Sequence, residues 1–202
     1  MLLDVQDSHL VLIDYQIRLM PALFEGAAAL ANGMRLGQMA RLLQVPVTGT
    51  EQNPAKLGEN APEIRALCDA TLAKMHFSAC ADGLAELLRP PVKPAQGGNA
   101  RSLPKHLQKP PDSGSNHRNT IVVAGCEAHV CLLQTALDLL DEEFEVWVVT
   151  DACTSRTERS RDAAFDRLAS AGAELLTTEM VAFEWLRTAE HAQFKAVQGL
   201  IK

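Results

Sequence analysis

The stretch AGCEAHVCLLQTALDLLDE, residues 124–142, contains two cysteines, a histidine and a glutamate where an apolar run gives way to a helical pattern. This spacing predicts a strand, a short turn and then a helix whose first turn contains Cys131. Backbone N–H groups at a helix N-terminus are unpaired and partly positive, so they lower the pKa of a nearby thiol and can hold an oxyanion. We therefore expect Cys131 to be a nucleophile, whereas Cys126 follows the strand glycine and points into the core or the turn.

A thiol nucleophile needs a proton acceptor and a group that holds charge. Asp14 ends the apolar run LVLID, and Lys74 follows a weaker strand pattern. In an open α/β sheet the carboxyl ends of the strands meet at one edge, where ligands bind. We expect Asp14 to accept the thiol proton and return it to a leaving group, and Lys74 to hold charge or polarise the substrate. Taken singly, the aspartate is also typical of a turn or helix cap, and the lysine of a solvated surface.

Four further side chains are predicted to shape the pocket, and these are Phe24, Glu51, Gln52 and His129. Each has a structural alternative: core packing for the phenylalanine, hydrogen bonding for the glutamate and glutamine, and helix capping for the histidine. Glu127, His129 and Cys131 are metal-ligand types, but no second histidine lies at ligand spacing nearby, so we expect no metal and no other cofactor. Arg156 is expected to hold the turn after the fifth strand or to contact another subunit.

Two kinds of apolar segment alternate along the chain and would position these residues. Strand patterns cover residues 9–15, 45–50, 120–125, 144–152 and 173–178, with a weaker one at 71–77. Helical spacing covers residues 27–43, 131–142, 159–171, 181–186 and 189–201. Apolar strands that alternate with helices predict an α/β fold, namely a doubly wound (Rossmann-like) three-layer sandwich with a mainly parallel sheet.

One stretch departs from this alternation. Residues 89–119 are rich in Pro, Gly, Ser and basic residues and have little periodicity. This composition predicts a surface loop inserted into a single domain of residues 1–202, although its basic charge is also typical of an interaction arm. The side chains that it would offer to RNA are Lys93, Arg101, Lys105, His106, Lys109, His117 and Arg118.

The composition points away from nucleic acid and membranes. The 202 residues are 47% hydrophobic and 22% charged, with a formal net charge of −6. No apolar run reaches membrane-spanning length, and the acidic N-terminus lacks the features of a signal peptide. Five cysteines without CxxC spacing are typical of reduced thiols, and Cys68, Cys80 and Cys153 are expected only to pack. We therefore expect a small-molecule substrate and a cytoplasmic location, with an organelle such as the mitochondrion as the alternative.

Several motifs occur together and in order, among them LVLIDYQ, TEQNPAKLGENAPEI, AKMHFSA, AGCEAHVCLLQTALDLL and VTDACTSR. With them the chain resembles the isochorismatase-like cysteine hydrolases, and most of all the isochorismatase domain-containing branch, whose members carry a TEQ-P-x-x-LG motif and a DACSSR-like motif. The resemblance covers nearly the whole chain except residues 89–119. It implies a six-stranded parallel sheet and a homo-oligomer, either a dimer or a tetramer.

The family has a catalytic triad of Asp, Lys and Cys, which by motif corresponds to Asp14, Lys74 and Cys131. The Asp-x-His metal motif of nicotinamidases is missing, since TEQNP stands in that neighbourhood. The cysteine favours hydrolysis of a small-molecule amide or a related carbon–nitrogen bond over cleavage of a vinyl ether.

The resemblance also implies a particular backbone in the turn before the helix. A cis peptide bond is expected from Cys126 to Glu127. The expected oxyanion donors are the backbone N–H of Cys131 and that of either Glu127 or Ala128.

Two alternatives come from other functional classes. The first is a ribonuclease or RNA-associated protein, because some relatives in this branch have carried a ribonuclease label and residues 89–119 are basic. The second is a non-catalytic oligomeric member of the fold, which predicts that Cys131 is unreactive.

Overall fold

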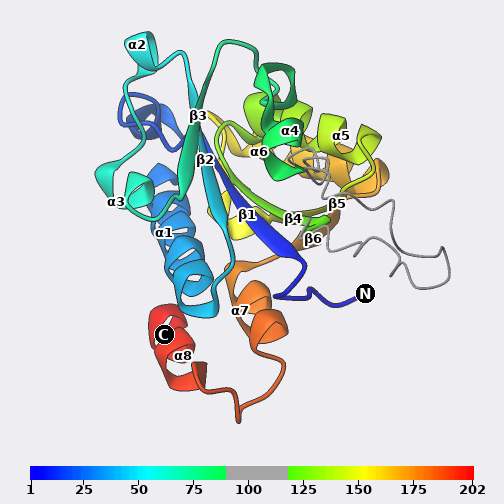
Figure 1. Ribbon diagram of the computed structural model, residues 1–202. Coiled ribbons are helices and arrows are strands. Elements are labelled where there is room, and N and C mark those ends of the chain that lie inside the picture. Colours follow the sequence, from blue (N-terminus) through cyan, green and yellow to red (C-terminus); the bar gives the residue numbers. More distant parts are fainter. Residues whose placement is uncertain (90–117) are drawn as a thin grey trace, which may run out of the picture.

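The computed structural model describes residues 1–89 and 118–202 (Figure 1). Their central element is a six-stranded sheet with the strand order β3-β2-β1-β4-β5-β6, and every neighbouring pair is parallel. The strands are β1 (Ser8–Ile13), β2 (Val47–Gln52), β3 (Ala70–Lys74), β4 (Thr120–Gly125), β5 (Glu145–Val149) and β6 (Glu174–Leu176). The predicted doubly wound α/β sandwich is confirmed, and its sheet is parallel throughout.

The central strands β1, β2 and β4 are buried along almost their whole length. Parallel strands that are covered on both faces have such continuous buried runs. β1 and β4 pair side by side, and the strand order runs outward from them in opposite directions. The topological switch point, where ligands bind in such sheets, therefore lies at the carboxyl ends of β1 and β4.

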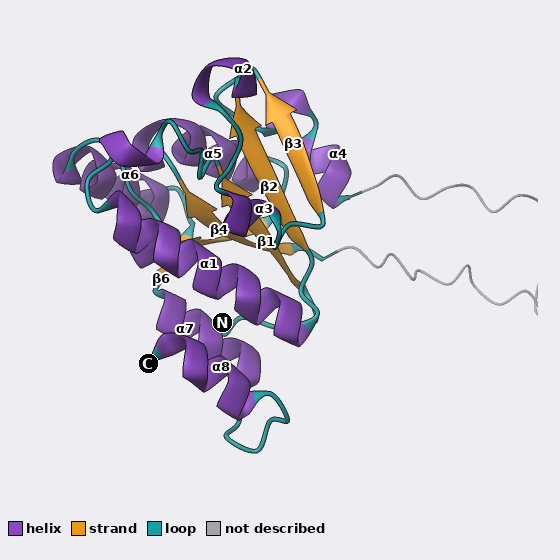
Figure 2. Ribbon diagram, turned by 90° about the vertical axis from the view of Figure 1, so that its left-hand side faces the viewer, coloured by secondary structure: helices purple, strands orange, loops and turns teal. Residues whose placement is uncertain are grey.

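Helices cover both faces of the sheet (Figure 2). On one side lie α1 (Gly26–Leu43) and α3 (Pro62–Arg65), with α7 (Thr178–Leu186) and α8 (Phe194–Ile201) packed against α1. On the other side lie α4 (Leu84–Leu88), α5 (Leu133–Asp141) and α6 (Glu158–Ser170). The short helix α2 (Pro54–Leu57) follows β2 at the carboxyl edge.

The observed elements differ from the predicted ones mainly at their ends. β1 stops at Ile13 because Asp14 has a φ of 52°, in the left-handed region that an extended strand does not use. β2 runs two residues further than predicted, so Glu51 and Gln52 lie in the strand rather than after it. Cys131 was predicted in the first turn of the helix α5. It lies instead in a π-helical turn, Ala128–Leu132, that leads into this helix.

The helices α7 and α8 also begin at other residues than predicted. α7 starts at Thr178, three residues early, because the Thr177 side chain accepts from the Met180 backbone N–H and caps the helix. α8 starts at Phe194 rather than at residue 189. The short helices α2, α3 and α4 carry too few residues for a periodic pattern, and the sequence did not predict them.

A glycine permits the close approach of β1 and β4 at the switch point. Gly125 has a φ of 144°, and a Cβ atom placed on it would lie 2.1 Å from the Ile13 carbonyl oxygen. Any other residue type would force the two strands apart there. Directly after it, Cys126 N–H donates to Ile13 O at 2.9 Å. The turn that carries Cys131 therefore begins beside the end of β1.

Residues 90–117, most of the predicted insertion, lie outside the described residues. All the side chains suggested for RNA binding fall there except Arg118. The Arg118 guanidinium donates to Val5 O at 2.6 Å and to Ser8 O at 2.9 Å. In the described part of the chain this arginine therefore holds the segment that leads into β1.

All five cysteines are free thiols. Within residues 1–89 and 118–202, no helix has the length and apolar character needed to cross a membrane.

Candidate active site

Asp14, Lys74 and Cys131 come together at the carboxyl edge of the sheet. Asp14 follows β1, Lys74 is the last residue of β3, and Cys131 lies in the turn after β4. Lys74 Nζ lies 2.8 Å from Asp14 Oδ2, and neither side chain is exposed to solvent. Burial of an ion pair costs several kcal/mol per ion in lost hydration, roughly, before the attraction is counted. Buried charges of this kind are candidates for a functional site.

Strand β2 contributes two polar side chains to this cluster, because alternate residues of a strand share a face. Thr50 Oγ1 donates to Asp14 Oδ1 at 2.7 Å, and Gln52 Oε1 accepts from Lys74 Nζ at 2.7 Å. Cys131 Sγ lies 3.9 Å from the same Gln52 oxygen, within reach of a hydrogen bond from sulfur. The structure thus brings Gln52 to the cluster together with Thr50, which was not among the predicted pocket residues.

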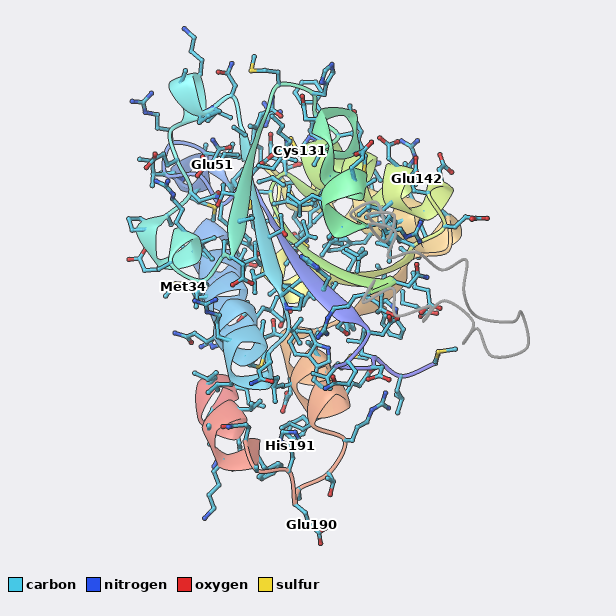
Figure 3. All side chains as sticks on the ribbon, in the orientation of Figure 1. Met34, Glu51, Cys131, Glu142, Glu190 and His191 are labelled. Atoms are coloured by element: carbon cyan, nitrogen blue, oxygen red, sulfur yellow. The ribbon has the colours of Figure 1, made fainter. Side chains whose placement is uncertain are left out.

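Glu51 points to the opposite face of β2, so the structure does not bring it to the cluster. Its Oε1 accepts from Asn60 N at 2.9 Å and lies 3.9 Å from Arg65 Nε of α3. Figure 3 shows Glu51 on the α3 side of the sheet and Cys131 on the α5 side. The contacts of Glu51 are those of a buried hydrogen-bonding residue, which was its structural alternative.

The environment of Cys131 opposes the thiolate that was expected from its place near a helix start. Cys131 is only 6% exposed, and the pKa of its thiol is raised to about 12. Burial is the largest cause, the Asp14 carboxylate also raises this pKa, and the Lys74 ammonium lowers it. The expectation of a lowered pKa is therefore wrong for this structure, because burial and the Asp14 carboxylate together outweigh the Lys74 ammonium. At neutral pH Cys131 carries its proton.

The turn after β4 has a cis peptide bond between Cys126 and Glu127. Ala128 N–H donates to Thr154 O at 2.8 Å and so joins this turn to the segment after β5. Because that N–H is already bonded, Ala128 is not available as an oxyanion donor. Of the two expected alternatives, the Glu127 N–H makes no such backbone hydrogen bond within the described residues.

His129 and Arg156 tie the same two segments together. His129 Nδ1 lies 3.0 Å from Ser155 Oγ, and Arg156 Nε donates to Glu127 Oε1 at 2.8 Å. Ser155 thus holds the histidine ring. Arg156 joins the turn after β5 to Glu127, which corresponds to the first of the two roles expected for this arginine. Among the described residues, no group of three or more His, Cys, Asp and Glu side chains is placed to hold a metal ion.

Phe24 lies in a different cleft. Its ring faces the Arg161 guanidinium at 5.4 Å, and its backbone N–H donates to Ser155 O at 2.9 Å. The cleft has a volume of about 490 Å³ and is lined by residues of α1, α6 and the segment after β5, but not by Asp14, Lys74 or Cys131. The structure therefore does not place Phe24 with the three catalytic candidates.

Gln16 is a further member of the site that the sequence reasoning missed. Gln52 N donates to Gln16 Oε1 at 2.9 Å, and Gln16 Nε2 donates to Gln52 O at 3.0 Å. The motif IDYQ places this glutamine two residues after Asp14. That spacing was the available signal, but a glutamine after a strand has no specific signature by itself.

Comparisons with known proteins show the family of this chain. A family model described as the isochorismatase domain matches residues 103–180. Isochorismatase domain-containing protein 2A of Mus musculus is 34% identical over 197 residues, which are 98% of this chain and 84% of the mouse protein.

Solved structures show the same fold. MAR1 ribonuclease from Caenorhabditis elegans superposes with a TM-score of 0.82 at 28% identity, over 100% of this chain and 92% of that chain. The YcaC gene product of Escherichia coli, described as an octameric hydrolase of unknown specificity, has a TM-score of 0.75 at 24% identity, over 99% and 94% of the two chains. The second likeness is one of fold alone. With a relative at 34% identity that spans 98% of its length, this chain belongs to the isochorismatase-like hydrolase family.

Proposed function

We propose that this protein hydrolyses a small-molecule amide, or a related carbon–nitrogen bond, through Cys131 as nucleophile. Asp14 accepts and returns the proton, and Lys74 holds the charge. The observation that carries the proposal is the buried 2.8 Å contact between Lys74 Nζ and Asp14 Oδ2 beside a cysteine thiol. A buried ion pair costs hydration and is not required for a stable fold. Acyl transfer through a thiol, by contrast, uses a carboxylate that accepts the proton and a cation that holds charge.

In the first step the attack and the proton transfer occur together, because the resting Cys131 is protonated. Sγ forms a bond to the substrate carbonyl carbon while the thiol proton moves to Asp14 Oδ2. This oxygen lies close to the Lys74 ammonium, but it has no hydrogen-bond partner among the described residues. A lone pair on Oδ2 is therefore available for the proton.

The carbonyl oxygen becomes an oxyanion, for which the backbone N–H groups of Glu127 and Cys131 are the proposed donors. Asp14 gives its proton to the leaving nitrogen, the carbon–nitrogen bond breaks, and the acyl group stays on sulfur as a thioester. Asp14 then takes a proton from water as the water oxygen attacks the thioester carbonyl. The sulfur leaves, recovers the proton from Asp14, and the carboxylic acid is released.

The test is a screen of small amides and ureas with intact-mass detection of an acyl adduct on the protein. We expect an adduct and turnover with the natural sequence, and loss of both in Cys131→Ala. Cys80→Ala is the matched control, since that thiol lies near Thr135 O, away from Asp14 and Lys74. If Cys131→Ala retained turnover, the proposal would be wrong. If neither an adduct nor turnover appeared with any compound of the screen, the non-catalytic alternative would replace it.

A second candidate function follows from one comparison. The C. elegans neighbour at 28% identity is described as a ribonuclease. If this chain shared that activity, it would cleave RNA and bind it with a steep dependence on salt. Cleavage of labelled RNA that survives in Cys131→Ala would favour this candidate over the amide hydrolase.

We also propose that the protein is a homo-oligomer in a reducing, cytoplasmic compartment. The octameric E. coli neighbour supports the first statement and the five free thiols support the second. Light scattering on the purified protein measures the oligomer directly, and the mass of a single chain would contradict it.

A further inference from the structure

The Lys74 ammonium donates its hydrogen bonds to acceptors within the protein. An ammonium group has three N–H donors. Nζ donates to Gln52 Oε1 at 2.7 Å, to Phe77 O at 3.1 Å and to His76 O at 3.5 Å, and it lies 2.8 Å from Asp14 Oδ2 as the partner of an ion pair. The three hydrogen-bond acceptors match the three donors, so none is left over for a substrate carbonyl. Lys74 therefore acts through its charge, and its acceptors determine where that charge lies.

Among these acceptors, Gln52 also contacts the nucleophile. Its Oε1 lies 3.9 Å from Cys131 Sγ as well as 2.7 Å from Lys74 Nζ. Its Nε2 donates to Met75 O at 2.8 Å, and this bond determines which end of the amide faces the lysine. The amide oxygen thus faces two hydrogen donors, the ammonium and the thiol.

The position of Gln52 is itself fixed by Gln16, in the segment after β1. Gln16 binds both the N–H and the carbonyl of Gln52, at 2.9 and 3.0 Å, and also donates to Gly58 O at 2.5 Å. Gln16 lies two residues after Asp14. The end of β2 is therefore held against the segment that carries the catalytic aspartate, and the Gln52 amide has little freedom to move.

From these contacts we infer that Gln52 is a positioning residue whose amide oxygen holds the Lys74 ammonium against Asp14 and accepts the Cys131 thiol hydrogen in the resting protein. The inference deepens the proposed function and rests on Cys131 as nucleophile. Its test, however, measures the thiol itself and requires no substrate.

Substitutions at position 52 should change the pKa of the Cys131 thiol, and the direction depends on the residue introduced. Gln52→Met removes the amide oxygen at similar volume, so the thiol loses its acceptor and a freed Lys74 N–H can turn to the sulfur. Both effects favour the thiolate. Gln52→Glu places a carboxylate beside the ammonium and near the sulfur, and so opposes the thiolate.

The experiment is the rate of iodoacetamide alkylation at Cys131 between pH 7 and 10, resolved by peptide mass spectrometry. At fixed pH we expect Gln52→Met to react about tenfold faster than the natural sequence and Gln52→Glu about tenfold slower, one pKa unit each way. The matched controls are Gln6→Met and Gln6→Glu. Gln6 is exposed and precedes β1, at the opposite end of that strand from Asp14. Both controls should leave the rate unchanged.

Opposite shifts cannot come from loosening of the fold, which would speed alkylation in both variants and expose buried Cys153 as well. Equal rates in all variants, or a rise in both, would overturn the inference. If Gln52→Met did not fold, Gln52→Asn, which withdraws the amide by one methylene, should shift the rate in the same direction by a smaller factor.

Failure of this inference and failure of the proposed function are distinguishable. If residue 52 had no effect on alkylation but Cys131→Ala abolished amide turnover, the inference would be wrong and the proposed function would stand. If the opposite shifts appeared and no amide were turned over, Gln52 would still position the pair, and the substrate class would be wrong.

Discussion

At the scale of single residues, burial and nearby charges together determine the pKa of the Cys131 thiol. Burial and the Asp14 carboxylate raise the thiol pKa and the Lys74 ammonium lowers it, and together they bring it to about 12. A protonated, buried thiol is a poor target for chance electrophiles at neutral pH. In the proposed mechanism it becomes a nucleophile only when Asp14 takes its proton during the attack on a bound substrate.

Asp14→Asn should therefore separate the reactivity of the thiol from catalysis. Loss of the carboxylate lowers the Cys131 pKa, so alkylation at pH 9 should become faster. Amide turnover should fall by about 10²- to 10⁴-fold, the usual contribution of a general base. Asp162→Asn, at an exposed carboxylate of α6, is the control and should change neither rate. Slower alkylation in Asp14→Asn would show that the aspartate does not face the thiol.

At the scale of elements, three strand ends determine the geometry of the site. β1 ends where Asp14 turns into the left-handed region, β3 ends at Lys74, and β4 ends at Gly125. The close approach at Gly125 holds the turn with Cys131 beside Asp14. The site therefore depends on the spacing of β1 and β4 as much as on its own side chains.

Gly125→Ala should damage both stability and the site. Its Cβ would lie 2.1 Å from Ile13 O, and backbone cannot move aside as a flexible side chain does. We expect a loss of about 1–3 kcal/mol or more in the free energy of unfolding, measured by chemical denaturation, and a drop in turnover. Gly199→Ala, in the helix α8 with nothing within 4 Å of the new Cβ, should instead be neutral or stabilising by up to about 1 kcal/mol. A Gly125→Ala protein of natural stability would contradict this account of the switch point.

At the scale of the whole molecule, the packing of two helical layers on a parallel sheet buries several thiols at once. Burial raises the pKa of Cys153 from 9.0 to about 12, and it raises the pKa of Cys126 well above 9.0. In the unfolded chain these thiols lose their protons near pH 9, while in the folded protein they retain them to much higher pH. The unfolded state then binds fewer protons, so stability falls as the pH rises.

Above pH 9 the free energy of unfolding should therefore decrease with pH, and the fall attributable to Cys153 should extend to about pH 12. Each fully buried thiol contributes about 1.4 kcal/mol per pH unit in this window. Cys153→Ala should reduce the slope by about that amount between pH 9 and 10.5. Denaturation curves at several pH values measure the slope, which is independent of any constant loss of packing. An unchanged slope would mean that Cys153 ionises as freely in the folded protein as in the unfolded chain.

The sequence by itself determined the architecture and the convergence of Asp14, Lys74 and Cys131. Alternation of apolar strands and helices allows few solutions besides a doubly wound parallel sheet. In such a sheet all strands end at one edge, so residues far apart in the chain are brought together by topology alone. The strand predicted at residues 120–125 coincides with β4. Lys74 contacts Asp14, and Gln52 contacts both Lys74 and Cys131.

Only the tertiary structure decided which neighbours complete the site. Neighbouring residues of a strand point to opposite faces of the sheet. Because the sequence left the end of β2 uncertain, it could not show that Gln52 faces Lys74 and Glu51 faces the other side. The pKa of Cys131 depends on burial by several elements, whereas the sequence shows only the local helix start. Likewise the Ala128 N–H is taken by Thr154, a residue that the chain brings close only after β5 has joined the sheet. Local patterns determine elements, but burial and hydrogen-bond partners come from contacts between distant segments.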